Sequence, residues 1–209
     1  MALVKYNNNS ISAVTAAAAI PSGAMTHIKT LTASSSGTLS FVHGSNGVVL
    51  DSTYPIYKFE FINIHPDGDQ RDLTFNMSTD SGSNYNVVKT TTWFEALHFE
   101  GEAAASVAYN GNADLAQSTA FQTISNGLGG SDDDNCNGEI TLFNPSSTTF
   151  VKHFLCTASS NYRTGLPGEI NSYIAGYMNT TSAVNAIQFK MESGNIDSGK
   201  IKLYGIKDS

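Results

Sequence analysis

Two stretches of the sequence gather the oxygen-bearing side chains that bind calcium. The stretch SDDDNCNG contains Asp132–Asp134, and the stretch HPDGDQRD contains Asp67, Asp69 and Asp72. An EF-hand calcium loop needs ligands at alternating positions and a carboxylate at its last position, and Glu139 does not fit that spacing. The pattern favours solvated acidic loops and predicts no bound metal or cofactor. Calcium binding by Asp132–Asp134 is left open.

The residue types that most often catalyse reactions are not spaced for catalysis. No nucleophile elbow, P-loop or dinucleotide fingerprint occurs in the sequence. Glu95 in WFEAL is the best candidate for a catalytic carboxylate inside a strand, and a glycosidase-like pair would depend on folding rather than on spacing. We therefore expect no enzymatic activity. The histidines follow none of the metal-ligand spacings, and they are His27, His43, His65, His98 and His153.

Several tyrosines lie next to turns, where a carbohydrate-binding module presents aromatic rings. They are Tyr54, Tyr85, Tyr109 and Tyr162. Rings at such positions can stack on sugars, which gives a candidate glycan-contacting set. The alternative is that each ring is buried at a sheet edge with only its hydroxyl in water.

The two cysteines bracket a predicted hairpin. The stretch TLFNPSSTTF predicts two strands joined at 144–147. If Phe143 faces Thr149, paired residue numbers sum to 292, and Cys136 then lies opposite Cys156. A one-residue change of register removes that pairing. We expect two reduced thiols and leave a disulfide open.

The elements that must position these residues are short strands. In IYKFEFINI, Tyr57, Phe59 and Phe61 alternate with Lys58 and Glu60, which is the period of a half-buried strand. Similar stretches recur every 8 to 15 residues, separated by turn-forming residues. The segment after residue 112 allows a short helix or an irregular strand. We predict a single all-β domain over 26–209, an antiparallel β-sandwich or jelly roll of about ten strands, with an extended N-terminal arm over 1–25.

The composition excludes several classes of partner. Charged residues are only 14% of the 209, and the net charge is −7. An acidic chain lacks the basic face that nucleic acid or an anionic membrane requires. No apolar run approaches the roughly 18 residues of a membrane span, so we expect no membrane insertion. The Asn-rich start is unlike a secretion signal.

The sequence resembles a family of small structural proteins from tailed phages of marine bacteria, many known only from ocean metagenomes. The resemblance rests on TLTASSSGTLSFV, VVLDSTYPIYKFEFINIHP, GSNYNVVKTTT, DLAQST, LFNPSSTTFVKHF and YIAGYMNTTSAVNAIQFKMESGNIDSGKIKLYGIK. Similar endings close β-sandwich domains in many phage virion proteins. The resemblance implies a virion component, assembled in the host cytoplasm, whose partners are other virion proteins, and it implies no catalytic residues.

The resemblance gives the arm a role. Its apolar residues are too sparse to fold alone, so we expect them to dock on the virion: Leu3, Val4, Tyr6, Ile11, Val14 and Ile20. A low-charge β-domain must also cover its edge strands, and symmetric assembly is one way to do so.

Three hypotheses follow for the whole protein. It is a tail fibre or spike-type adhesion component that contacts host surface glycans, a homo-oligomer with a trimer favoured. Alternatively, it is a head decoration protein that clamps capsomers, or a phage-encoded carbohydrate-binding module without a structural role.

Overall fold

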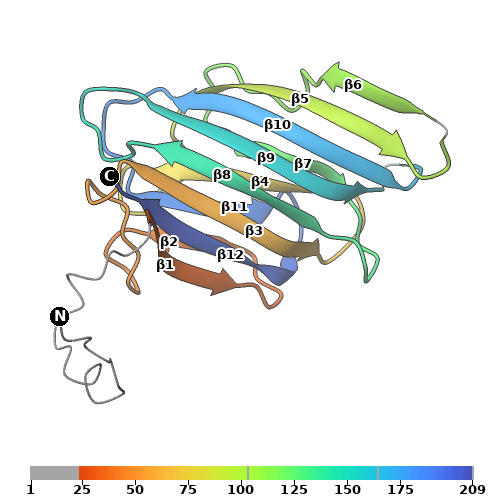
Figure 1. The fold of residues 1–209 in the computed structure, drawn as a ribbon, viewed down its shortest axis with the longest axis horizontal. Coiled ribbons are helices and arrows are strands. Elements are labelled where there is room, and N and C mark those ends of the chain that lie inside the picture. The colour runs from red at the N-terminus through yellow and green to blue at the C-terminus, as the bar shows by residue number, and fades with distance from the viewer. Residues whose placement is uncertain (1–23, 103, 164, 209) are drawn as a thin grey trace, which may run out of the picture.

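The computed structural model describes residues 24–102, 104–163 and 165–208, and every helix or strand within them is a β-strand (Figure 1). The strands are β1 (Met25–Thr32), β2 (Leu39–Val42), β3 (Ile56–Pro66), β4 (Arg71–Ser78), β5 (Lys89–Phe99), β6 (Ala105–Tyr109), β7 (Gln122–Leu128), β8 (Cys136–Phe143), β9 (Lys152–Tyr162), β10 (Gly168–Met178), β11 (Ala186–Met191) and β12 (Ile196–Ile206). The predicted all-β antiparallel fold is confirmed, with twelve strands instead of about ten.

The differences from the prediction are local. The strand that sequence reasoning missed is β6, and the segment after Asn112 is irregular up to β7, without a helix. Of the predicted arm, only Ala24 and Met25 lie within the described residues, and Met25 begins β1. The six docking residues of the arm lie outside them. In the described part of the chain, no helix is long and apolar enough to span a membrane.

The strands form two layers. The larger layer has the order β1-β12-β3-β8-β9-β10-β5-β6, and the smaller has the order β2-β11-β4-β7. They join at one corner, where Leu128 of β7 pairs with Tyr162 of β9. Figure 1 shows the larger layer in front and the smaller layer behind it. One face of the larger layer therefore packs against the smaller layer, and its other face is on the outside.

The core fills the space between the layers. Tyr57, Phe59 and Phe61 of β3 are buried, whereas Lys58 and Glu60 lie on the outer face, as their alternation predicts. Phe189 of β11 contacts Phe59 and Phe61 from the opposite layer, with ring centroids 5.7 and 5.4 Å apart. Each aromatic contact of this kind adds about 0.5–1.5 kcal/mol to the burial of the rings themselves.

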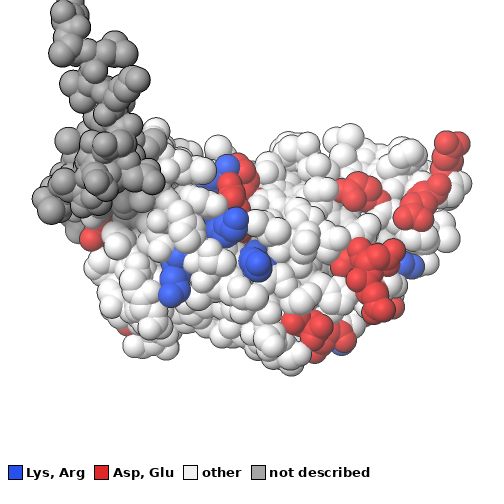
Figure 2. Space-filling view, turned by 60° about the horizontal axis from the view of Figure 1, so that its bottom comes forward, with Lys and Arg blue, Asp and Glu red and all other residues white. Residues whose placement is uncertain are grey.

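Short connections place the loops at two ends of the sandwich. The loops β1–β2, β3–β4, β5–β6, β7–β8, β9–β10 and β11–β12 form what we call the distal end. The first and last described residues, Ala24 and Asp208, lie at the opposite, terminal end, where the Lys207 amide donates to the Ala24 carbonyl over 3.0 Å. The distal loops are bound to each other, since the amides of Gly130 and Asn195 donate to the carboxylates of Asp69 and Asp67, both over 2.8 Å. Figure 2 shows Asp and Glu side chains gathered toward one end of the molecule.

The register of the β8–β9 hairpin differs from the predicted one. Cys136 pairs with Ser160, and Cys156 pairs with Ile140, so paired residue numbers sum to 296. The connection is longer than predicted because it occupies all of 144–151. The cysteines are therefore four positions apart along the ladder, roughly 13 Å at 3.3 Å per residue. Both are buried free thiols.

Candidate ligand-binding face

An apolar surface covers part of the outer face of the larger layer. We call it the aromatic face and define it by Phe94 of β5, Val107 and Tyr109 of β6, Leu155 of β9, and Tyr173 and Tyr177 of β10. Five of these six residues are 38–78% exposed, and Tyr177 is half-buried. Contiguous exposed apolar side chains of this kind usually mark a binding site. The aromatic face is therefore the first candidate for a functional site.

Strand register brings the rings together. Tyr109 pairs with Phe94, and Phe94 pairs with Tyr173, so the three residues form one row across β6, β5 and β10. Directly paired residues of antiparallel strands point to the same side of a sheet. The rings of Phe94 and Tyr173 stack with centroids 4.9 Å apart and 9° between their planes. Each ring covers one face of the other, so a ligand can reach only the remaining faces and the edges.

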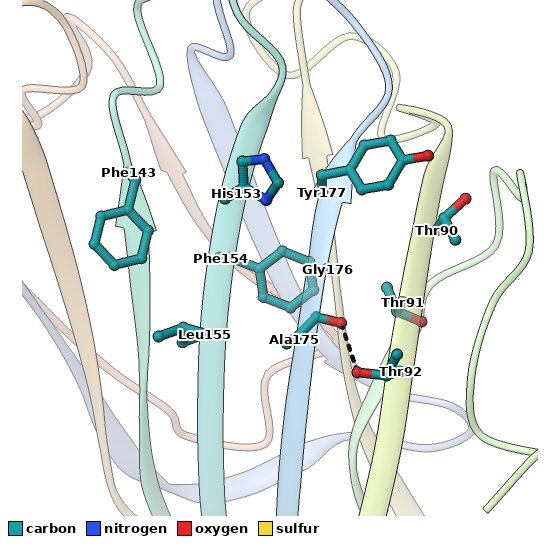
Figure 3. Close-up of a pocket in the computed structure, with 10 residues that line it drawn as sticks. All are labelled: Thr90, Thr91, Thr92, Phe143, His153, Phe154, Leu155, Ala175, Gly176 and Tyr177. Atoms are coloured by element: carbon teal, nitrogen blue, oxygen red, sulfur yellow. Dashed lines mark hydrogen bonds between the residues drawn. The ribbon is translucent and has the colours of Figure 1, made fainter.

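A hollow lies beside this stack. It has two parts of about 380 and 250 Å³, which share Thr92, Leu155 and Ala175 among their lining residues. Ala175 points outward between Thr92 and Leu155, and its methyl group forms a low floor because larger side chains surround it. Phe94 and Tyr173 line the smaller part, and Phe143, His153 and Tyr177 line the larger one (Figure 3).

Hydroxyl and amide groups border the larger part of the hollow. Thr90 Oγ1 accepts hydrogen bonds from the backbone and side-chain amides of Gln117 at 3.2 and 2.9 Å. The same side-chain amide lies 3.4 Å from the Tyr177 hydroxyl, and its carbonyl oxygen accepts from Asn179 over 2.8 Å. This network fixes Tyr177 and leaves its hydroxyl able to donate to a ligand.

The hollow carries no carboxylate, lysine or arginine among its lining residues. The cross-strand row that continues from Thr157 reaches charged residues at Glu139 and then Glu60. Both carboxylates form ion pairs with Lys58 Nζ, at 2.6 and 3.7 Å. The hydrogen bond to Glu139 raises the pKa of Lys58, so that pair stays ionised and mutually neutralised. The site therefore suits a neutral ligand with apolar patches and hydroxyl groups.

Of the four tyrosines predicted to contact glycans, only Tyr109 belongs to the aromatic face. Tyr54 is 9% exposed and packs edge-on against Tyr57. Tyr85 is half-buried in the β4–β5 loop at the terminal end. Tyr162 is half-buried against Phe99 at the distal end. The four rings therefore do not form one site, and for Tyr54 the alternative of a buried ring is the correct one.

The acidic loops use their carboxylates to hold themselves together. Asp134 is 5% exposed and accepts hydrogen bonds from the Ser131 amide and from Arg163 Nε, both at 3.0 Å. This contact raises the pKa of Arg163. Asp132 and Asp133 are exposed. Across the described residues, no three His, Cys, Asp or Glu side chains lie close enough to hold a metal ion.

Glu95 has a structural role within β5. One of its oxygens accepts hydrogen bonds from Trp93 Nε1 and Asn110 Nδ2, both at 3.1 Å. Trp93 is fully buried, and Asn110 begins the β6–β7 connection. Glu95 thus anchors a buried indole and a loop.

Sequence reasoning missed Phe94, Leu155, Tyr173, Tyr177 and His153 as members of a site. One signal in the sequence could have found them. Three strands contain two adjacent apolar residues, in WF, FL and YI. Because adjacent residues of a strand point to opposite faces, both faces of each of these strands are apolar there. Strands that are apolar on both faces are typical of sheets that are covered on both. That the three pairs become neighbours depends on the β5-β10-β9 order.

In comparisons with known proteins, no protein-family model, no curated protein and no solved structure matches this chain.

Proposed function

We propose that this protein is a non-enzymatic structural component of a phage virion, displayed on the particle surface as a tail fibre or spike-type adhesion component that binds host glycans through the aromatic face. The stacked pair of Phe94 and Tyr173 beside a neutral hollow carries the proposal. The C–H faces of a sugar ring pack on aromatic rings, and its hydroxyls bond to groups such as Tyr177 and the threonines of β5.

The placement of the chain ends supports display on a particle. The described chain begins with Ala24 at the terminal end, and attachment by that end would leave the distal end pointing away from the particle. An arm anchored through Leu3, Val4, Tyr6, Ile11, Val14 and Ile20 would then hold the domain by one end. The aromatic face lies on β5, β6, β9 and β10, several strands away from β1, where the described chain begins.

The experiment is a glycan array of neutral hexose and N-acetylhexosamine oligosaccharides, probed with the full chain and with the variants Phe94→Ala and Tyr173→Ala. We expect binding by the wild type and a loss of roughly two- to tenfold in either variant, since an aromatic contact contributes roughly 0.5–1.5 kcal/mol. Phe150→Ala is the matched control, because Phe150 is 69% exposed in the β8–β9 loop and lines neither part of the hollow.

A head decoration protein is the second candidate. The extent of exposed apolar surface on β5, β6, β9 and β10 favours it, because such a surface also suits burial against capsomers. Copy number in purified virions, measured by mass spectrometry against the major capsid protein, distinguishes the candidates. Hundreds of copies indicate decoration, and a few tens or fewer indicate the tail. Absence from particles leaves a free carbohydrate-binding module.

A further inference from the structure

The strand β6 forms an open edge of the larger layer. Among the described strands it pairs with β5 alone, and Figure 1 shows it at the border of the sheet. All five of its residues are exposed, and Val107 at its centre is 78% exposed. An apolar edge strand of this kind is a template for pairing with another chain.

The other edges in the described residues are protected in ways that β6 is not. The β1 edge has a register shift between His27 and Lys29, which breaks its regular geometry and places a lysine on it. The β2 edge has only four residues. By contrast, the sequence from 103 to 113 contains no charged residue and no proline. Bulges and charged side chains are usual protections of a sheet edge, and the five residues of β6 have neither.

Two hydrogen bonds flanking the β5–β6 ladder fix which backbone groups of β6 are free. The Phe99 amide donates to the Ala104 carbonyl, and the Asn110 amide donates to the Trp93 carbonyl, both at 3.1 Å. Hydrogen-bonded and non-hydrogen-bonded pairs alternate along an antiparallel ladder. Because these two pairs are hydrogen-bonded, the even-numbered residues of β6 bond to β5, and the odd-numbered ones do not.

The free groups belong to Ala105, Val107 and Tyr109. Their amides and carbonyls point away from β5 to the open edge, and Val107 and Tyr109 pair with outward-facing residues of β5, so their side chains lie on the outer face. Three donors and three acceptors are thus spaced along an edge with Val107 at its midpoint. Such an edge is complementary to a copy of itself running in the opposite direction.

We propose that β6 of one copy pairs with β6 of a second copy, antiparallel about Val107, in a two-fold dimer. Ala105 then faces Tyr109 of the other copy, Val107 faces its own counterpart, and six backbone hydrogen bonds satisfy every free group of both edges. No like charges are brought together in the paired strands. The two aromatic faces become one continuous surface across the joined sheets, which differs from the three-fold assembly expected of a fibre.

A cysteine substitution on the axis tests this pairing in the full chain. In Val107→Cys, the two new cysteines are a hydrogen-bonded pair with Cα atoms about 5.5 Å apart, within the range of a disulfide. In the control Ala105→Cys, the equivalent residues are four positions apart, roughly 13 Å, which a disulfide cannot bridge. Cys136 and Cys156 are buried and do not interfere.

We expect mild oxidation to convert Val107→Cys into a covalent dimer and to leave Ala105→Cys uncross-linked. Light scattering should give the wild type twice the 22.2 kDa chain mass, and Val107→Lys, which places like charges opposite each other, should give a monomer of unchanged thermal stability. A monomeric or trimeric wild type, or equal cross-linking of both cysteine variants, would overturn the proposal. So would a dimer that persists in Val107→Lys, since another chain segment or another surface would then form the contact. Glycan binding by the wild type is scored separately from its mass, so a monomeric wild type that binds glycan would overturn the dimer and leave the adhesion proposal standing.

Discussion

Phe94 of β5 and Tyr173 of β10 are direct cross-strand neighbours on the outer face of the larger layer, and their rings stack in parallel. Neither ring contributes to the core, because Trp93 and Ile174 beside them in sequence point inward and fill it. The stack stabilises a flat, rigid element on an exposed surface. Rigid aromatic surfaces lose little conformational entropy on binding, which suits recognition of a weakly interacting ligand such as a sugar.

Filling the hollow should abolish ligand binding without unfolding the protein. Ala175→Phe adds a ring to the floor between Thr92 and Leu155, on the outer face where no core atom is displaced. We expect affinity for any array-identified glycan to fall more than about tenfold, and the melting temperature to stay within about 2 °C, as for most surface substitutions. Asn171→Phe is the control on the same strand face, outside the hollow. Equal losses in both variants would argue against the hollow.

Replacing Lys89 should stabilise the protein at neutral pH. Lys89 is fully buried, and desolvation lowers its pKa to about 8. Its ammonium donates to the Ala120 carbonyl, which also lies 3.4 Å from Asn76 Nδ2, so the carbonyl keeps a partner when the lysine is removed. A shift from 10.5 to about 8 corresponds to about 3 kcal/mol of destabilisation below pH 8. In Lys89→Met, we expect the free energy of unfolding at pH 7 to rise by about 1–3 kcal/mol.

The pH dependence distinguishes this cause from simple repacking. Between pH 8 and 10.5, the unfolded chain binds more protons at Lys89 than the folded one does, so the wild type gains stability from this group as pH rises. The difference between Lys89→Met and the wild type should therefore shrink across that range in urea titrations. A difference that stays constant with pH would show that charge burial is not its source.

The two thiols should be unreactive until the protein unfolds. Burial raises the pKa of Cys136 to about 12 and raises that of Cys156 as well, so neither forms a thiolate at neutral pH. With a thiol reagent such as dithionitrobenzoate, we expect no rapid reaction in buffer and two equivalents in denaturant. A chain that releases fewer than two thiols when unfolded would contain the disulfide that the register excludes.

Calcium should leave thermal stability unchanged. Arg163 and the Ser131 amide occupy the Asp134 carboxylate, and backbone amides occupy those of Asp67 and Asp69. A ligand present at 100 times its dissociation constant would stabilise the fold by about 2.7 kcal/mol. We expect melting temperatures in millimolar calcium and in chelator to agree within about 1 °C. An increase of several degrees with calcium, absent with magnesium, would identify a calcium site in these loops.

Strands in which apolar and polar residues alternate clearly were predictable from the sequence, and strands without this alternation were not. β3 was predictable because Tyr57 and Phe59 alternate with Lys58, which assigns one face to the core. β6 was missed because its sequence, ASVAY, is small and nearly uniform, and it is defined only by pairing with β5. The predicted β8–β9 register was wrong because the residue types in 144–151 do not determine how many of these residues stay unpaired in the loop.

The residue type of the candidate site, but not its position in the fold, was predictable from the sequence. Aromatic residues for sugar stacking were expected next to turns, but the exposed rings that meet lie within strands. Phe94 and Tyr173 are 79 positions apart in the sequence, and they became neighbours because β10 inserts between β9 and β5. Local patterns do not specify such an order of strands.

Glycan binding by the aromatic face can be observed by backbone amide and methyl NMR during titration with an array-identified oligosaccharide. We expect chemical-shift changes confined to outward-facing residues of β5, β9 and β10, centred on Phe94, Ala175 and Tyr173. Changes confined to the distal loops, or no saturable change with any neutral glycan, would contradict it.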